Sequence, residues 1–117
     1  MSQTLDDHGV VFTGLDESGF ALATNAGVTV RPLLVTEAGH RVDAFYLTIA
    51  AGAEINAERH PYSETLVMVH GEFSCALEGD DPVVVRPGQI CHIHGNAQHH
   101  VRNDGPAPAE AVMLIGV

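Results

Sequence analysis

Length, composition and charge restrict the class of protein. The chain has 117 residues, 45% of them hydrophobic, which is enough for one globular domain that buries roughly two-thirds of its unfolded surface. Fifteen acidic residues outnumber five arginines, lysine is absent, and the formal net charge is −10. This balance argues against binding to nucleic acid or to an anionic membrane surface, because both require basic side chains. Without lysine, Schiff-base chemistry on a lysine side chain is excluded.

The start of the chain and its cysteines indicate a cytoplasmic protein. Residues 1–7 lack the basic-then-apolar profile of a secretory signal, and no apolar run reaches the about eighteen residues of a membrane span. Cys75 and Cys91 are the only cysteines, and each lies within an apolar stretch. We therefore expect buried, reduced thiols rather than a disulfide framework, and a soluble protein of the cytoplasm.

The first 26 residues carry weak patterning. They predict an arm with an edge strand or two, around residues 10–12 and 19–23, and no linker separates them from the rest of the chain. Residues 1–26 are therefore expected to belong to the same single domain as residues 27–117, which hold the strong strand signals.

Short stretches rich in β-branched residues succeed one another from residue 27 onward, punctuated by glycines near the 8–12 residue rhythm of a sandwich or barrel. The predicted strands are residues 27–35, 42–49, 65–69, 73–77, 83–85, 90–94 and 111–115. Pro61 could also begin a helix, but the run after it is β-branched and ends at Gly71, which favours a strand. The pattern predicts an all-β fold, a small barrel of antiparallel strands.

Two acidic residues and one histidine lie close together in the sequence near the middle of the chain. Glu58 and His60 are two residues apart, so within a strand their side chains leave the same face of the sheet. Glu64 opens the next strand and shares a face with Leu66 and Met68. Because that face is otherwise apolar, we expect the Glu64 carboxylate to point into one end of the core.

A buried carboxylate needs compensation, and a metal ion would supply it. An ionised carboxylate in a low-dielectric interior costs several kcal/mol unless it is paired. His99, which comes after a polar turn, offers a second imidazole from a distant part of the chain. Two carboxylates and two neutral imidazoles balance the charge of a dication, and this donor set suits a divalent transition metal. The alternative places Glu58 and Glu64 on solvated turns beside Arg59.

Two further histidines are candidates for proton transfer. His92 and His94 share a face of the predicted strand 90–94, opposite Cys91 and Ile93. One of them could line the same cavity, either as an acid–base catalyst facing the substrate or as a group that supports a metal ligand. The alternative for each is a hydrogen-bonded or exposed imidazole without a direct role.

Two segments, residues 52–71 and residues 88–103, resemble the paired motifs of the cupin superfamily. The family pattern is Gly-(five)-His-x-His-(three or four)-Glu-(six)-Gly, and then Gly-(five)-Pro-x-Gly-(two)-His-(three)-Asn. The positions that fall at the required spacings are Gly52, His60, Glu64, Gly71, Gly88, His99 and Asn103. The resemblance implies a single-domain cupin, whose fold is a jelly-roll-like β-barrel, also called a double-stranded β-helix.

Three positions depart from the family pattern. Glu58 stands where the family has its first histidine, His94 stands for the proline, and Asn96 stands for the second glycine. The last two departures should affect only the turn before His99. The first matters more, because it replaces a nitrogen ligand of the implied metal site with an oxygen.

The resemblance implies a ligand set residue by residue. His60, Glu64 and His99 remain as a two-histidine, one-carboxylate set for a divalent ion such as Fe, Mn, Zn or Ni. Glu58 either completes the set or stays free as a base beside the metal. The resemblance also implies a homodimer, since similar proteins usually pair or exchange edge strands.

We interpret the chain as a metal-dependent enzyme that acts on a small organic molecule inside the barrel. The metal would polarise an oxygen of the substrate, and Glu58 or a cavity histidine would move a proton, which fits an elimination, an isomerisation or a cyclisation. A dioxygenase is the nearest alternative, because open coordination positions on Fe(II) admit dioxygen. Few aromatic residues are present, so we expect an aliphatic cavity with Met68 and Tyr62 among its lining.

Two other classes stay open. In a metal-free enzyme, two nearby carboxylates would push their pKa values apart and serve as acid and base. In a binding or sensing module, the same residues would hold a ligand or a metal without turnover.

Overall fold

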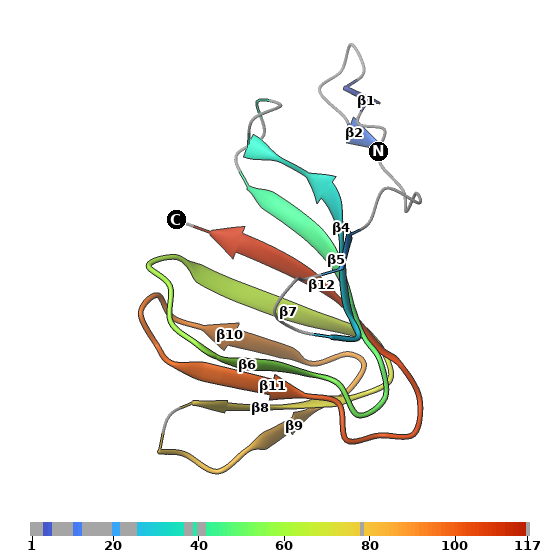
Figure 1. Ribbon diagram of the computed structural model, residues 1–117. Helices are drawn as coiled ribbons and strands as arrows, with labels where there is room; N and C mark the ends of the chain where they lie inside the picture. Colours follow the sequence, from blue (N-terminus) through green and yellow to red (C-terminus); the bar gives the residue numbers. More distant parts are fainter. Residues whose placement is uncertain are drawn as a thin grey trace.

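The computed structural model of the protein is built on two β-sheets (Figure 1). The described residues are 4–5, 11–12, 20–21, 26–36, 39, 42–77 and 79–116, and side chains are described for 26–36, 39, 42–56, 59–77 and 79–116. No helical segment within these ranges combines the length and the apolarity that crossing a membrane requires.

The larger sheet has six antiparallel strands in the order β10-β7-β12-β5-β4-β3. They are β3 (Phe20–Ala21), β4 (Val28–Leu34), β5 (Asp43–Ile49), β7 (Ser63–His70), β10 (Ile90–Ile93) and β12 (Ala109–Gly116).

The smaller sheet has four antiparallel strands in the order β6-β11-β8-β9. They are β6 (Glu54–Glu58), β8 (Phe73–Leu77), β9 (Val83–Val85) and β11 (His99–Arg102). A separate ribbon pairs β1 (Thr4–Leu5) with β2 (Val11–Phe12). From β5 onward, the chain changes sheet between β5 and β6, β6 and β7, β7 and β8, β9 and β10, β10 and β11, and β11 and β12. Residues close to these crossings can therefore meet in the interior from both sheets.

A shared apolar interior holds the two sheets together. Inward-facing residues alternate with outward-facing ones along β7, where Leu66 and Met68 are buried, and Phe73 and Val101 are buried on the smaller sheet. Fully burying a side chain of this size stabilises a fold by roughly 1.5–3 kcal/mol. The interior is therefore the main source of stability, and any charged group placed in it must be compensated.

A close contact at Gly71 fixes the crossing from β7 to β8. Its φ is +70°, and a Cβ added there would lie 2.6 Å from the Pro108 carbonyl oxygen and 3.0 Å from the Cα of Ala109. Only glycine fits both the left-handed backbone and the missing space. This explains in physical terms why the first motif ends on a glycine.

The buried side chain of Asn103 ties the end of β5 to the connection between β11 and β12. Its Nδ2 donates to the carbonyl oxygens of Ile49 and Ala107, each over 2.8 Å, and its Oδ1 accepts from the Gly105 N–H over 3.0 Å. Its own backbone carbonyl accepts from the Gly52 N–H over 2.8 Å. The asparagine that ends the second motif is thus a structural residue whose amide is fully used.

The all-β prediction is confirmed, and each of the seven strands expected from residue 27 onward is present. Strands β2 and β3 lie within the segments expected to hold edge strands, and the run after Pro61 forms strand β7 from Ser63 onward rather than a helix. The predicted strand set lacked β1, β6 and β11. The last two carry charged or polar residues at most of their positions, so their composition gives little strand signal.

Candidate metal centre

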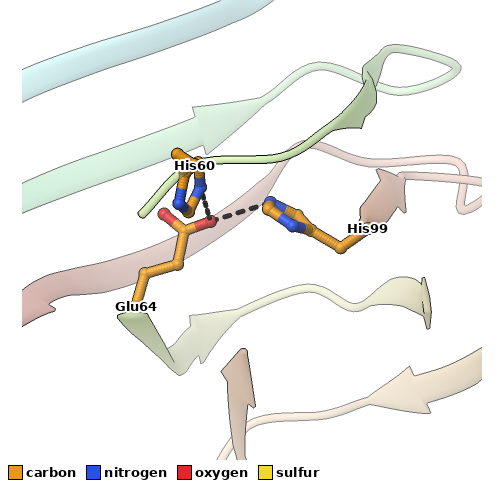
Figure 2. A group of neighbouring side chains, drawn as sticks. All are labelled: His60, Glu64 and His99. Atoms are coloured by element: carbon orange, nitrogen blue, oxygen red, sulfur yellow. Dashed lines mark hydrogen bonds and ion pairs between the residues drawn. The ribbon is translucent and has the colours of Figure 1, made fainter. Parts of the chain in front are cut away.

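His60, Glu64 and His99 come together at one end of the interior (Figure 2). His60 comes just after the end of β6, Glu64 is the second residue of β7, and His99 begins β11. One potential ligand atom from each residue lies within 4.8 Å of the other two. Their side chains are 12%, 9% and 1% exposed, respectively, so the group is screened from bulk water.

Two loops from different sheets bring these residues together. The backbone N–H of Asn96 donates to the His60 carbonyl over 2.6 Å. A Cβ added at Gly95 would lie 2.6 Å from the carbonyl oxygen of Pro61, so the turn before His99 packs directly onto the loop after His60. Asn96 has a φ of 65°, a left-handed conformation that asparagine tolerates better than other residues with a Cβ. This is a conformation that glycine, the residue of the motif at this position, also adopts readily.

Backbone carbonyls fix which ring nitrogen of each histidine faces the Glu64 carboxylate. The Nδ1–H of His60 donates to the carbonyl of Tyr62 over 2.9 Å, and the Nδ1–H of His99 donates to the carbonyl of Ala97 over 2.9 Å. A carbonyl only accepts, so Nδ1 carries the proton in each neutral ring and the lone pair is on Nε2. Metal-binding histidines in proteins are held in this way.

Both Nε2 atoms point at the same carboxylate oxygen. Oε1 of Glu64 lies 3.2 Å from Nε2 of His60 and 2.9 Å from Nε2 of His99 (Figure 2). In the metal-free protein, a proton on Nε2 can join each imidazole to this oxygen. When both rings are neutral, lone pairs on two nitrogens and one oxygen converge on a point that a cation can occupy. Donor atoms at about 2.1 Å from an ion and at right angles to each other are about 3.0 Å apart, so these separations fit a transition metal.

The electrostatics of Glu64 keep its carboxylate ionised. In the metal-free protein, burial raises the pKa of this carboxyl, but the hydrogen bond from a protonated His99 and the positive charges of protonated His60 and His99 lower it more. The net result is a pKa below the ordinary value of 4.5. The residues present thus fit a divalent ion in donor type, tautomer and charge.

A mostly apolar cavity of about 450 Å³ lies next to the cluster. Glu64 and His99 form part of its wall together with Val30, Asp43, Phe45, Leu47, Ile55, Tyr62, Leu66, Val101, Met113 and Ile115. Its size suits a small organic molecule. Among the described residues, Asp43 is the one charged side chain in the wall besides the candidate ligands, and its carboxylate accepts the Thr36 N–H over 2.6 Å.

Tyr62 connects the cavity to the cluster. Its ring stacks on the imidazole of His60, with centroids 4.0 Å apart and planes 8° from parallel, and it also lines the cavity. The expectation for Tyr62 thus agrees with the structure. Met68 is buried in the core but does not line the cavity, whereas Met113 does. The difference arises because Met113 is on the neighbouring strand β12, beside Leu66.

Other candidate residues lie elsewhere. His92 and His94 are exposed on the outer face of β10 and its end, and neither lines the cavity, so the expectation that one of them does so is not met. Their neighbour Ile93 points inward, and alternation along the strand turns the histidines outward. Nδ1 of His92 pairs with the Thr65 hydroxyl over 2.7 Å.

Glu58 is described only by its backbone, which pairs with His99 across β6 and β11. Its side chain is outside the described residues, so its role stays a prediction. The sequence reasoning missed Asp43, Phe45 and Leu47, which line the cavity from β5. Their spacing of two along one strand was the available signal, but it does not show which face of a strand meets a cavity.

The fold and the cluster define a cupin. A family model described as Cupin domain matches residues 45–115, so the chain belongs to the cupin family. No curated protein sequence matches the chain significantly.

Solved structures share this fold. A putative ethanolamine utilization protein from Salmonella typhimurium covers 98% of this chain and 92% of its own, at 15% identity and a TM-score of 0.79. A predicted oxalate decarboxylase from Thermotoga maritima covers 77% and 80%, at 22% identity and a TM-score of 0.70. The Cupin_2 domain of a transcriptional regulator from Enterobacter cloacae covers 78% and 97%, at 25% identity and a TM-score of 0.66.

Proposed function

We propose that this cupin is a metal-dependent enzyme that acts on a small organic molecule, through a lyase, isomerase or cyclase type of reaction. The observation that carries the proposal is the convergence of two Nε2 lone pairs on one buried carboxylate oxygen, beside an apolar cavity. His60, Glu64 and His99 would hold the ion. A bound divalent ion would supply Lewis-acid polarisation of a carbonyl, hydroxyl or enolate oxygen.

The protein's own residues prepare the site for such a reaction. The carbonyls of Tyr62 and Ala97 hold the two imidazoles in one tautomer and one orientation. The apolar walls keep water away from the reacting groups, which strengthens the electrostatic interactions there. We assign the proton transfer to Glu58, because its backbone is paired with that of His99 at the edge of the cluster. If Glu58 is instead a fourth ligand, the proton must pass through the substrate or through water.

Two alternatives have support of their own. A two-histidine, one-carboxylate set with open positions is also the ligand set of non-haem Fe(II) oxygenases, which favours a dioxygenase as the second candidate. A small-molecule binding domain without turnover is the third, because one similar structure is the cupin domain of a transcriptional regulator. The similarity to a predicted oxalate decarboxylase favours the non-redox enzyme.

Elemental analysis of protein purified without added metal tests the proposal. We expect close to one divalent transition metal per chain, lost in the His99→Ala variant and retained in the His94→Ala variant, which removes an exposed histidine outside the cavity. Iron together with substrate-dependent oxygen uptake would favour the dioxygenase. Full activity after complete chelation would instead support the metal-free acid–base enzyme and overturn the proposal.

A further inference from the structure

Cys75 and Cys91 face each other across the interior from different sheets. Cys75 is on β8 of the smaller sheet and Cys91 is on β10 of the larger sheet. Cys75 is paired in register with Val101, and Cys91 with Leu66, and both of these residues point into the core. Both cysteines therefore point toward the interior, and both line one cavity between the sheets. Both are free thiols.

The two thiols are in hydrogen-bond contact but differ in their surroundings. The hydrogen bond that Cys75 donates to Cys91 raises the pKa of the Cys75 thiol and lowers the pKa of the Cys91 thiol. Cys75 is buried, with 7% of its surface exposed, whereas Cys91 is half-buried. Cys91 is therefore the more exposed of the two cysteines.

A second cavity, of about 260 Å³, gives access to this pair. Both cysteines line it, and its wall includes the exposed side chains of Val83, Ile90 and His92, so it opens to solvent. Within the described part of the chain, Asp80 and Asp81 are the acidic residues that line it, and no arginine does. Together with the net charge of −10, these carboxylates disfavour an anionic oxidant and favour a neutral one.

We propose that Cys75 and Cys91 form a site that neutral hydroperoxides oxidise to a disulfide between the two sheets. The observations that carry it are the cavity that both cysteines line, their pairing with inward-facing residues of the two sheets and the difference in their burial. The cysteines are not among the candidate metal ligands, although Glu64 and His99 act on Cys91 electrostatically, and the proposed oxidation does not require a bound metal.

The chemistry balances in two steps. The Cys91 thiolate attacks one oxygen of the hydroperoxide, an S–O bond forms, the O–O bond breaks, and an alcohol or water leaves after taking a proton. The Cys75 sulfur then attacks the Cys91 sulfur, an S–S bond forms, and the hydroxyl leaves as water with the Cys75 proton. Two thiols lose two electrons in total, and one hydroperoxide gains them.

The proposal is tested on the full chain at low protein concentration, with a chelator present to prevent metal-catalysed oxidation. After hydrogen peroxide treatment, we expect the loss of both thiols, a mass decrease equal to two hydrogen atoms, and a peptide that joins Cys75 to Cys91. Dithiothreitol should restore the thiols. Retention of both thiols in the folded protein, or cross-links only between chains, would overturn the proposal.

Two variants test the order of the steps. The Cys75→Ser variant lacks the thiol that the second step requires. Oxidation of Cys91 should therefore stop at a sulfenic acid, which dimedone traps. In Cys91→Ser, the buried Cys75 should resist peroxide. If either variant does not fold, alkylation of the native chain replaces it, and we expect iodoacetamide to modify Cys91 about tenfold faster than Cys75. Equal rates of alkylation would contradict the assigned roles.

Discussion

The backbone N–H of Asn96 donates to the carbonyl of His60 over 2.6 Å, so the loop that carries one candidate ligand is bonded to the turn that leads to another. Neither partner of this bond is a side chain. The position of His60 relative to His99 is therefore set by main-chain geometry. A substitution can change it by altering the backbone conformation of these two loops or the space between them. Substitutions that alter the loops should act on the metal centre without touching a ligand.

Gly95→Ala is expected to disturb the metal centre through sterics alone. The added methyl would lie 2.6 Å from the Pro61 carbonyl oxygen, a backbone atom that cannot move aside like a flexible side chain. We expect the free energy of unfolding to fall by about 1–3 kcal/mol, as for other overpacked sites, and the affinity for metal to fall with it. Denaturant unfolding and metal titration measure the two effects.

Gly116→Ala is the matched control for this substitution. Among the residues that the structure describes, a Cβ there meets only the Ser63 hydroxyl, at 3.8 Å, which is an ordinary contact. This variant should keep both its stability and its metal affinity. Equal behaviour of the two variants would show that the packing of Gly95 against Pro61 does not position the site.

Asn96 should be replaceable by glycine but not by alanine. Its φ of 65° strains any residue with a Cβ, and asparagine is among those that bear the strain best. We expect Asn96→Ala to lower the free energy of unfolding by about 1 kcal/mol and Asn96→Gly not to lower it. Metal affinity should stay unchanged in the glycine variant, because the donor to His60 is the backbone N–H. A glycine variant less stable than the alanine variant would contradict this.

Much of the fold and of the candidate site could be predicted from the sequence. The apolar β-branched runs predicted strands because burial on one face requires alternation, and Glu64, Leu66 and Met68 are buried together as that alternation indicates. The convergence of His60, Glu64 and His99 could be anticipated only because motif spacing encodes contacts between strands that are distant in sequence.

The other features of the fold and the site could not be predicted from the sequence, for physical reasons. Alternation shows that His92 and His94 share a face, but not that this face is the outer one, because the inner side depends on which strand pairs with β10. The stacking of Tyr62 on His60 and the approach of Cys75 to Cys91 depend on how the two sheets pack. Such packing is a property of the whole interior and leaves no local pattern.

Glu64→Gln should remove most metal binding while it preserves the shape of the site. Glutamine has the same length as glutamate but no charge, so the two imidazoles would keep their orientation and lose the anionic donor between them. Removing a group that only hydrogen-bonds to a metal ligand lowers metal affinity roughly 10–100-fold. Loss of the anionic ligand itself should therefore lower the affinity by more than about 100-fold. Isothermal titration with Zn²⁺ or Fe²⁺ measures this. Affinity within a few-fold of the native value would show that Glu64 is not a ligand.

Stability of the chelated protein should depend on pH through Glu64. Its pKa is lower in the folded protein than the ordinary value of 4.5, so the folded state binds fewer protons than the unfolded state in that range. The contribution of Glu64 to the free energy of unfolding is therefore fully present above about pH 4.5 and is lost as the pH falls through the lowered pKa. The Glu64→Gln variant lacks this titration, so the stability difference between the two proteins should shrink as acid is added. Denaturant unfolding of both chelated proteins between pH 7 and about pH 3 measures this difference. A stability difference that stays constant or grows toward low pH would show that the folded protein does not hold this carboxylate ionised.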